Sequence, residues 1–314
     1  MQARRHHYLS QCYLKGFTKG GSKDSRLAVL DFERGKFFET IPAKVGAIKD
    51  FNRINIPGVD PNEIENDISK IERQVASAIK NIEAKSSLDD EDKDVILYFI
   101  SLLAVRSPEM REVWRKFRED EYNITIGILL SDKKTWESVQ NQRRMNGEEV
   151  NENLTFEDMK QFYERKEYGI EVSREHHLEV EFVGADAVLH CLEKRNWLLV
   201  KTNSEIGGFI TTDKPVNLNW IDAGSVPAIY RSNPGYGLRG TQVHFHISKN
   251  IALIGEFEGR EGIVNATKEM VALLNAKMLC SFYKQIYAPK LGFYFWGKED
   301  GILEGTHLLK YLDK

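Results

Sequence analysis

The chain has 314 residues and a net charge of −3, and its 41% hydrophobic and 29% charged residues are typical of a soluble globular protein. It has no run of about 18 apolar residues, which excludes a membrane-spanning helix, and its acidic balance argues against a globally basic nucleic-acid-binding surface. The three cysteines are scattered and the basic start lacks the apolar stretch of a signal peptide, so we expect a cytoplasmic protein with no disulfide framework, no zinc-binding Cys pair and no membrane partner.

Residues 4–17 combine basic, imidazole, amide and aromatic side chains in the order RRHHYLSQCYLKGF. Such a density of side chains that donate, accept or ligate indicates a site. His7 with Gln11 nearby offers a general acid or base, because imidazole titrates near neutral pH. The alternative is that His7 and Gln11 satisfy backbone groups while the neighbouring aromatic side chains fill a groove of the core.

A β-hairpin is predicted over residues 26–39, where apolar stretches flank Glu33-Arg34-Gly35. Residues 50–61 are rich in Asn, Asp, Pro and Gly and predict a loop.

Three helices are predicted next. Ile and Val recur every three or four residues over 62–84, and apolar residues surround most of the circumference over 89–105, which predicts a buried helix. Ser107-Pro108 predicts the start of a third helix toward residue 128. The polar residues 132–176 predict an insertion or mobile arm with a helical stretch near 156–162.

The second half is richer in predicted strands. Alternation predicts strands over 178–182, over 196–202 paired with 208–212, and over 243–247 followed by 251–254 within hairpin distance. Helices are predicted over 186–194 and from about 261 to 283, with terminal strands near 286 and 292–296.

Runs of helices followed by runs of strands predict the α+β class, with a mixed or antiparallel sheet packed against a layer of long helices. We expect a single interwoven domain over residues 1–314, because the N-terminal segment and hairpin have too little apolar content to fold alone. The polar segment 132–176 is then an insertion within it.

Four motifs are spread over nearly the whole chain: His-Tyr-x-x-Gln-x-Tyr-Leu-x-x-Phe from residue 7, two Glu seven apart on a helix, Arg-x-Pro from residue 106, and Phe-Ile-Thr-Thr-Asp-x-Pro-Val from residue 209. Together they resemble the DUF4238 family. The matching residues are His7, Tyr8, Gln11, Tyr13, Leu14, Phe17, Glu65, Glu72, Arg106, Pro108, Trp197, Thr212, Asp213 and Pro215. The resemblance implies a mostly bacterial domain of unknown function, and it supplies no mechanism.

Glu65 and Glu72 lie two helical turns apart and therefore share one face of their helix. Carboxylates on an apolar stripe need a hydrogen-bond partner, a cation or a metal ion. Arg106 is the expected partner, because its planar guanidinium matches a carboxylate. The alternatives are an ion pair that braces the scaffold, metal ligation, and exposure to solvent.

Asp213 follows a predicted strand and precedes Lys214-Pro215, a position typical of catalytic or metal-binding carboxylates and equally of turns. Gly207-Gly208 before it allows close approach of a ligand or backbone. His244 and His246 share one face of their strand, as metal ligands or as polar residues of a half-exposed strand.

Motifs of kinases, dinucleotide oxidoreductases, α/β-hydrolases and zincins do not occur in the sequence. The first hypothesis is a nuclease-like phosphodiester hydrolase acting on a nucleic acid or nucleotide. Its catalytic residues are His7, Gln11, Arg106 and Asp213, and the metal ligands for Mg or Mn are Asp213 and one of Glu65 or Glu72. The second is a non-enzymatic binding or sensor module in which these residues are structural and the arm 132–176 meets a partner. The sequence predicts no oligomeric state.

Overall fold

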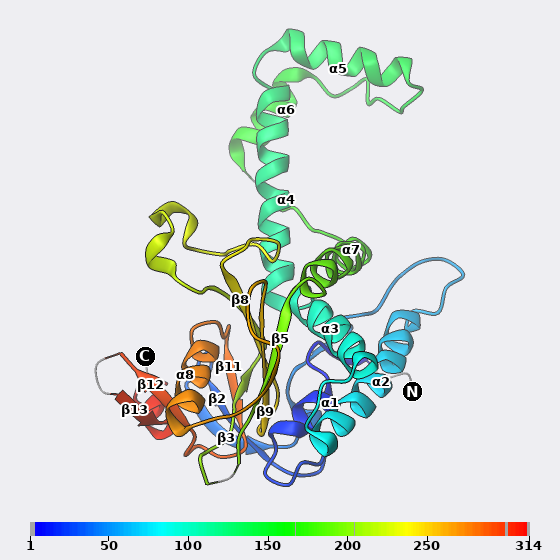
Figure 1. The fold of residues 1–314 in the computed structure, drawn as a ribbon. Coiled ribbons are helices and arrows are strands. Elements are labelled where there is room, and N and C mark those ends of the chain that lie inside the picture. The colour runs from blue at the N-terminus through cyan, green and yellow to red at the C-terminus, as the bar shows by residue number, and fades with distance from the viewer. Residues whose placement is uncertain (1–3, 167, 204, 299–300, 313–314) are drawn as a thin grey trace. The chain divides into compact units, whose positions relative to one another are not determined.

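The computed structural model describes residues 4–166, 168–203, 205–298 and 301–312. The chain forms two compact units, one from residues 1–108 and 178–314 and the other from residues 109–177. The first unit combines helices with antiparallel and mixed sheets, so the predicted α+β class is confirmed (Figure 1).

The first unit begins with a short ribbon and a predicted hairpin. Strand β1 (Arg5–His7) pairs antiparallel with β4 (Ala47–Lys49), and helix α1 (Gln11–Leu14) follows β1. Strands β2 (Leu27–Asp31) and β3 (Lys36–Thr40) pair antiparallel and confirm the hairpin. Gly35 at its turn has a φ of 59°, the left-handed conformation that glycine adopts without strain.

Helices α2 (Glu63–Lys85) and α3 (Asp90–Val105) confirm the two predicted helices. The apolar stripe of α2 is buried through Ile68, Val75, Ile79 and Ile82, as its spacing predicts. Helix α3 is apolar around most of its circumference and is correspondingly buried.

Two larger sheets complete the first unit (Figure 1). The five-stranded mixed sheet has the order β10-β5-β9-β8-β7, and the four-stranded antiparallel sheet has the order β3-β2-β11-β6. Their remaining strands are β5 (Asn196–Lys201), β6 (Thr211–Thr212), β7 (Val216–Trp220), β8 (Thr241–Ser248), β9 (Ile251–Glu256), β10 (Gly262–Asn265) and β11 (Gln285–Ala288).

The predicted pairing of residues 196–202 with 208–212 is wrong. Strand β5 is paired on one side with β9 and on the other with β10, so neither edge is open, and β6 pairs with β11 in the other sheet. The predicted hairpin of β8 with β9 is confirmed.

The predicted strand at 178–182 is also wrong, because these residues lie in helix α7 (Arg174–Leu192). Leu178, Glu181, Ala185 and Leu192 are buried at helical spacing. The alternation of Leu, Val and Phe with Glu therefore did not reflect a strand.

The predicted helix from 261 to 283 is partly wrong. Residues 262–265 form β10, and the helix α8 runs only over Lys268–Leu279, after Thr267 caps its first turn by accepting a hydrogen bond from the backbone N–H of Met270. Strands β12 (Tyr294–Gly297) and β13 (Gly301–Glu304) form a terminal hairpin.

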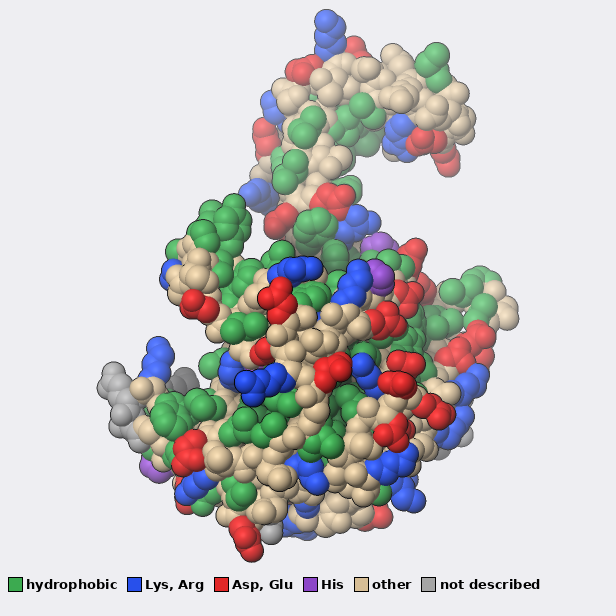
Figure 2. All heavy atoms as spheres, in the orientation of Figure 1, with side chains coloured by type: hydrophobic (Ala, Val, Ile, Leu, Met, Phe, Trp, Pro, Cys, Tyr) green, Lys and Arg blue, Asp and Glu red, His purple; other side chains and the backbone are tan. Residues whose placement is uncertain are grey.

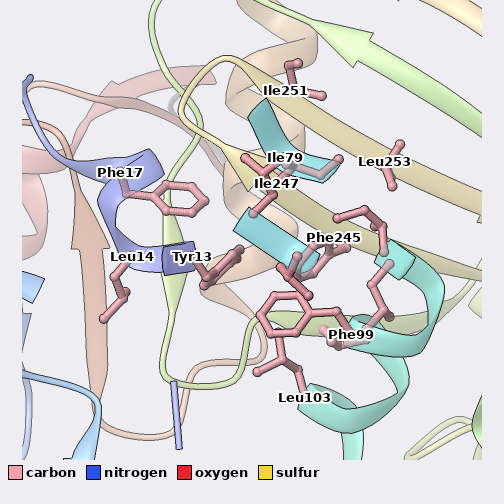
Figure 3. Close-up of a cluster of buried hydrophobic side chains, with 14 of the residues drawn as sticks. Tyr13, Leu14, Phe17, Ile79, Phe99, Leu103, Phe245, Ile247, Ile251 and Leu253 are labelled. Carbon is pink, nitrogen blue, oxygen red and sulfur yellow. The ribbon is translucent and has the colours of Figure 1, made fainter. Parts of the chain in front are cut away.

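The core of the first unit joins the N-terminal segment to the helices and the five-stranded sheet (Figure 3). The Tyr13 ring stacks on Phe245 of β8 at 5.3 Å between centroids and meets Phe99 of α3 edge-on at 5.8 Å. The Tyr13 hydroxyl donates to the backbone oxygen of His246 at 2.8 Å. This burial explains how a segment with little apolar content of its own becomes ordered.

Strand β8 was predicted to be half-exposed, and this is wrong. Val243, Phe245 and Ile247 face the helices, while His244 and His246 on the opposite face are 1% and 0% exposed. His246 lies against the Phe209 ring at 4.8 Å between centroids, so side chains cover both faces of the strand.

The second unit contains helix α4 (Pro108–Leu129), helix α5 (Lys133–Met145) and helix α6 (Phe156–Arg165). Its small core consists of Ile126, Leu130 and Trp136 with flanking Phe156, Met159 and Tyr163. The unit begins at residue 109, upstream of the predicted insertion boundary at 132. Helix α4 starts at Pro108, as Ser107-Pro108 predicts.

Gly255→Ala should destabilise the first unit. A Cβ at Gly255 would lie 2.7 Å from the indole of Trp197, its cross-strand neighbour, so the buried ring must shift at a cost of about 1–3 kcal/mol. Chemical denaturation should show this loss. Gly292→Ala is the control, because among the described residues no atom beyond its two chain neighbours lies within 4 Å of its Cβ position. Equal stability of the two variants would contradict the packing argument.

Candidate functional site

A buried polar network gathers residues from four distant segments of the first unit. The backbone N–H of Asn52 donates to His6 Nδ1 at 2.9 Å, and the Asn52 side-chain amide donates to Glu65 Oε2 at 2.5 Å. Arg106 Nη2 donates to Asn52 Oδ1 at 2.9 Å. Asn52 thus links β1 through its backbone N–H, and the start of α2 and the end of α3 through its side-chain amide.

The cation of this network is almost fully enclosed. Arg106 is 4% exposed, and its Nε lies 3.5 Å from a carboxylate oxygen of Glu181, which is 1% exposed. A buried charge is tolerated only when it is paired and hydrogen-bonded. The predicted Arg106 pairing therefore includes an acid of α7 that the sequence did not identify, and Arg106 reaches Glu65 through Asn52.

Strand alternation decides which histidine enters the network. His6 is fully buried and its Nδ1 accepts a hydrogen bond from the backbone N–H of Asn52. His7 points to the other face of β1. The network thus uses His6, whereas the sequence predicts His7 as the site residue.

His7 has a different environment. Burial, reinforced by the charge of Arg5, lowers its pKa to about 4, although a hydrogen bond to the backbone of Ala43 opposes the shift. Its Nε2 is enclosed and has no hydrogen-bond partner among the described residues. Gln11, the other polar candidate in this segment, is the half-buried first residue of α1.

Glu72 lies at the edge of the network and is half-buried. Burial raises its pKa and the charge of Glu65 adds to the shift, whereas a hydrogen bond with Ser10 and the charge of Arg106 lower it. Burial likewise raises the pKa of the Cys12 thiol to about 11, so Cys12 remains an unreactive thiol at neutral pH.

Asp213 belongs to a second network. Its carboxylate accepts the backbone N–H groups of Tyr283, Lys284 and Gln285 at 2.9, 2.8 and 3.0 Å, which fixes the turn that enters β11. Burial nevertheless raises its pKa to about 6, against the opposing effect of these hydrogen bonds.

The second network continues from this turn into β2 and the N-terminal segment. The Gln285 amide donates to Asp31 at 2.6 Å and its oxygen accepts from the Tyr287 hydroxyl at 2.6 Å. Tyr8 is hydrogen-bonded to Tyr287, and burial together with the charge of Asp213 raises the pKa of the Tyr8 phenol. His6 and Tyr8, two residues apart, therefore take part in different networks.

The three proposed metal ligands are divided between these networks. Glu65 and Asp213 accept N–H groups of Asn52 and of the β11 turn, respectively. Among the described residues, no three or more His, Cys, Asp or Glu side chains form a group that could hold a metal ion. Within the described part of the chain, Glu65, Glu72 and Asp213 are therefore not members of such a group.

Several residues of these networks were missed by the sequence analysis: His6, Asn52, Glu181, Asp31, Gln285 and Tyr287. For Glu181 a signal existed, because it falls on the helical stripe of Leu178 and Ala185. Asn52 lies in a segment read as a plain loop, and nothing local distinguishes it.

The chain matches the family described as protein of unknown function (DUF4238) over residues 5–290, and it therefore belongs to that family. No curated protein and no solved structure matches it. Within the described part of the chain, no helix is both long and apolar enough to cross a membrane.

Arg106→Ala should lower the stability of the first unit by about 3–5 kcal/mol, because it leaves the buried Glu181 charge without this partner. Thermal unfolding should show a fall in Tm of several degrees. Arg4→Ala removes an exposed ion pair with Asp50 and should leave Tm nearly unchanged. Equal melting of both variants would contradict a structural role for Arg106.

Asp213 should make stability fall as pH rises. Its pKa is about 6 in the folded protein against an ordinary 3.8, so the folded state favours the neutral acid. The contribution of this preference to the free energy of unfolding is complete below about pH 4 and is lost as the pH rises through 6. The stability advantage of the wild type over Asp213→Asn should shrink by up to about 3 kcal/mol between pH 4 and pH 7.5. An advantage that grows with pH would mean that the three N–H groups outweigh burial.

Proposed function

We propose that this DUF4238 protein is a non-enzymatic binding or sensor module whose N-terminal polar residues are structural. The observation that carries the proposal is the state of Arg106, which is 4% exposed and engaged by Asn52 and Glu181. A guanidinium that stabilises phosphate charge needs free donors facing the ligand, whereas these donors point into the protein.

The use of Asp213 supports the same proposal. Both of its carboxylate oxygens accept backbone N–H groups, so the motif around it serves the junction of β6 with β11. On the face drawn in Figure 2, basic and acidic side chains are interspersed, which is a poor match for a phosphate backbone. In this proposal the segment 132–176 contacts the partner.

A second candidate is a metal-assisted phosphodiester hydrolase, which one observation favours. His7 Nε2 lacks a hydrogen-bond partner among the described residues, which leaves this nitrogen able to accept a proton. Its pKa of about 4 keeps the ring neutral at pH 7 but makes it a weak general base there. Gln11 would orient the ring, and Arg106 with a cation on Asp213 and Glu65 or Glu72 would neutralise phosphate. These carboxylates would have to exchange their N–H partners for the ion.

The two candidates differ in their response to nucleic acid substrates. RNA and DNA incubated with the protein, with and without magnesium or manganese, should remain intact if the protein is a binding module. Cleavage by the wild type that disappears in His7→Ala would overturn the proposal and support the hydrolase.

The control is His307→Ala, which removes an exposed histidine of the same unit. Circular dichroism of each variant separates loss of chemistry from loss of fold. Asp213→Ala is less decisive, since loss of its three N–H contacts should also destabilise the β11 turn.

A further inference from the structure

The second unit contains an aromatic cavity that neither polar network includes. It has a volume of about 360 Å³ and lies between helices α4 and α6 and the segment after α6. Its lining includes Tyr122, Phe162, Tyr163, Tyr168, Met159 and Glu171. This volume falls in the range of small-molecule sites.

Two of the rings are held by hydrogen bonds through a single residue of α4. The Tyr163 hydroxyl donates to the backbone oxygen of Asn123 at 3.0 Å, and the Tyr168 hydroxyl donates to Asn123 Oδ1 at 2.8 Å. Tyr168 also stacks on Phe162, with centroids 5.4 Å apart and planes at 27°. Both hydroxyls are occupied as donors, and Tyr168 also stacks on Tyr163 with centroids 6.3 Å apart, so these rings form a stacked aromatic wall of the cavity.

The cavity is accessible and bears a negative charge. Tyr122 and Phe162 are each 48% exposed, and the exposed Glu171 belongs to the lining. A neighbouring cavity of about 490 Å³ shares Tyr122 and Glu171, and its Arg118 is paired with Glu121 at 2.7 Å. Aromatic faces beside a carboxylate favour a cation over an anion.

We propose that this cavity binds a methylated ammonium group. Aromatic rings attract cations through their quadrupole, most effectively when the cation is readily desolvated, as in quaternary ammonium recognition. Apolar Met159 suits N-methyl groups, whereas a primary ammonium needs three hydrogen-bond acceptors. The inference rests on the proposed binding function and names the chemical class of its ligand.

Choline is the probe, measured by titration calorimetry on the full chain and compared with two relatives. One is the neutral isostere in which carbon replaces the quaternary nitrogen, and the other is ethanolamine with its primary ammonium. Choline should bind at least about tenfold more tightly than either, equivalent to about 1.4 kcal/mol. Equal binding of the isostere would show an ordinary apolar cavity, and equal binding of ethanolamine would show no preference for methyl groups; either result, or no choline binding, overturns the proposal.

Variants locate the site. Glu171→Gln should weaken choline several-fold and leave the neutral isostere unchanged, because it removes only charge. Phe162→Leu should weaken choline as well, by removing an aromatic wall. Glu157→Gln is the matched control, since this exposed acid of α6 is not part of the lining; an equal loss in that variant would place the cation elsewhere.

The outcome is separable from that of the proposed function. Failure of choline to bind leaves the melting and nucleic acid experiments on the first unit unaffected. Cleavage of RNA or DNA would remove the proposed function, whereas choline titration of the second unit would still be readable.

Discussion

The enclosed positive charge of Arg106 must be neutralised within the first unit, and its partners join distant segments of the chain. The Arg106 guanidinium lies at the end of α3, where the apolar helix has buried its surroundings, and water cannot compensate it. Glu181 of α7 and Asn52 of an otherwise irregular loop supply the partners. Because Asn52 also binds His6 and Glu65, the charge at one helix end fixes the position of β1, the loop and the start of α2 together.

The same arrangement also orders the N-terminal segment. With His6 held in the Arg106 network and Tyr8 beside Asp213, the residues after them enter the core, where Tyr13 stacks on Phe245 and meets Phe99. Three aromatic rings from α1, α3 and β8 thereby pack together, and the hydroxyl of Tyr13 remains hydrogen-bonded. Polar anchoring and apolar packing thus act on the same few residues.

The sequence predicted the elements whose evidence is local. Helices α2 and α3, the β2–β3 hairpin and the start of α4 follow from apolar spacing, Gly35 and Pro108. The predictions are wrong where contacts between segments distant in the sequence decide the secondary structure or the strand pairing. Residues 178–182 alternate like a strand but are helical because the stripe of Leu178, Glu181 and Ala185 is buried, and β5 pairs with β9 and β10 across long sequence separations. The choice of His6 over His7 depends on which face of β1 meets Asn52, which no spacing reveals.

Asp213 illustrates how a residue of a sequence motif can have a structural role. Asp213 has a raised pKa of about 6 although three N–H groups favour its ionised form. The desolvation of the carboxylate on burial therefore outweighs its stabilisation by these hydrogen bonds. A carboxylate in that balance holds a turn at pH 7 at some expense of stability. The same carboxylate acts on Tyr8, two residues from His6, so its protonation would alter the electrostatics of the N-terminal segment as well as of the β11 turn. A change of charge at Asp213 therefore reaches the N-terminal segment at Tyr8.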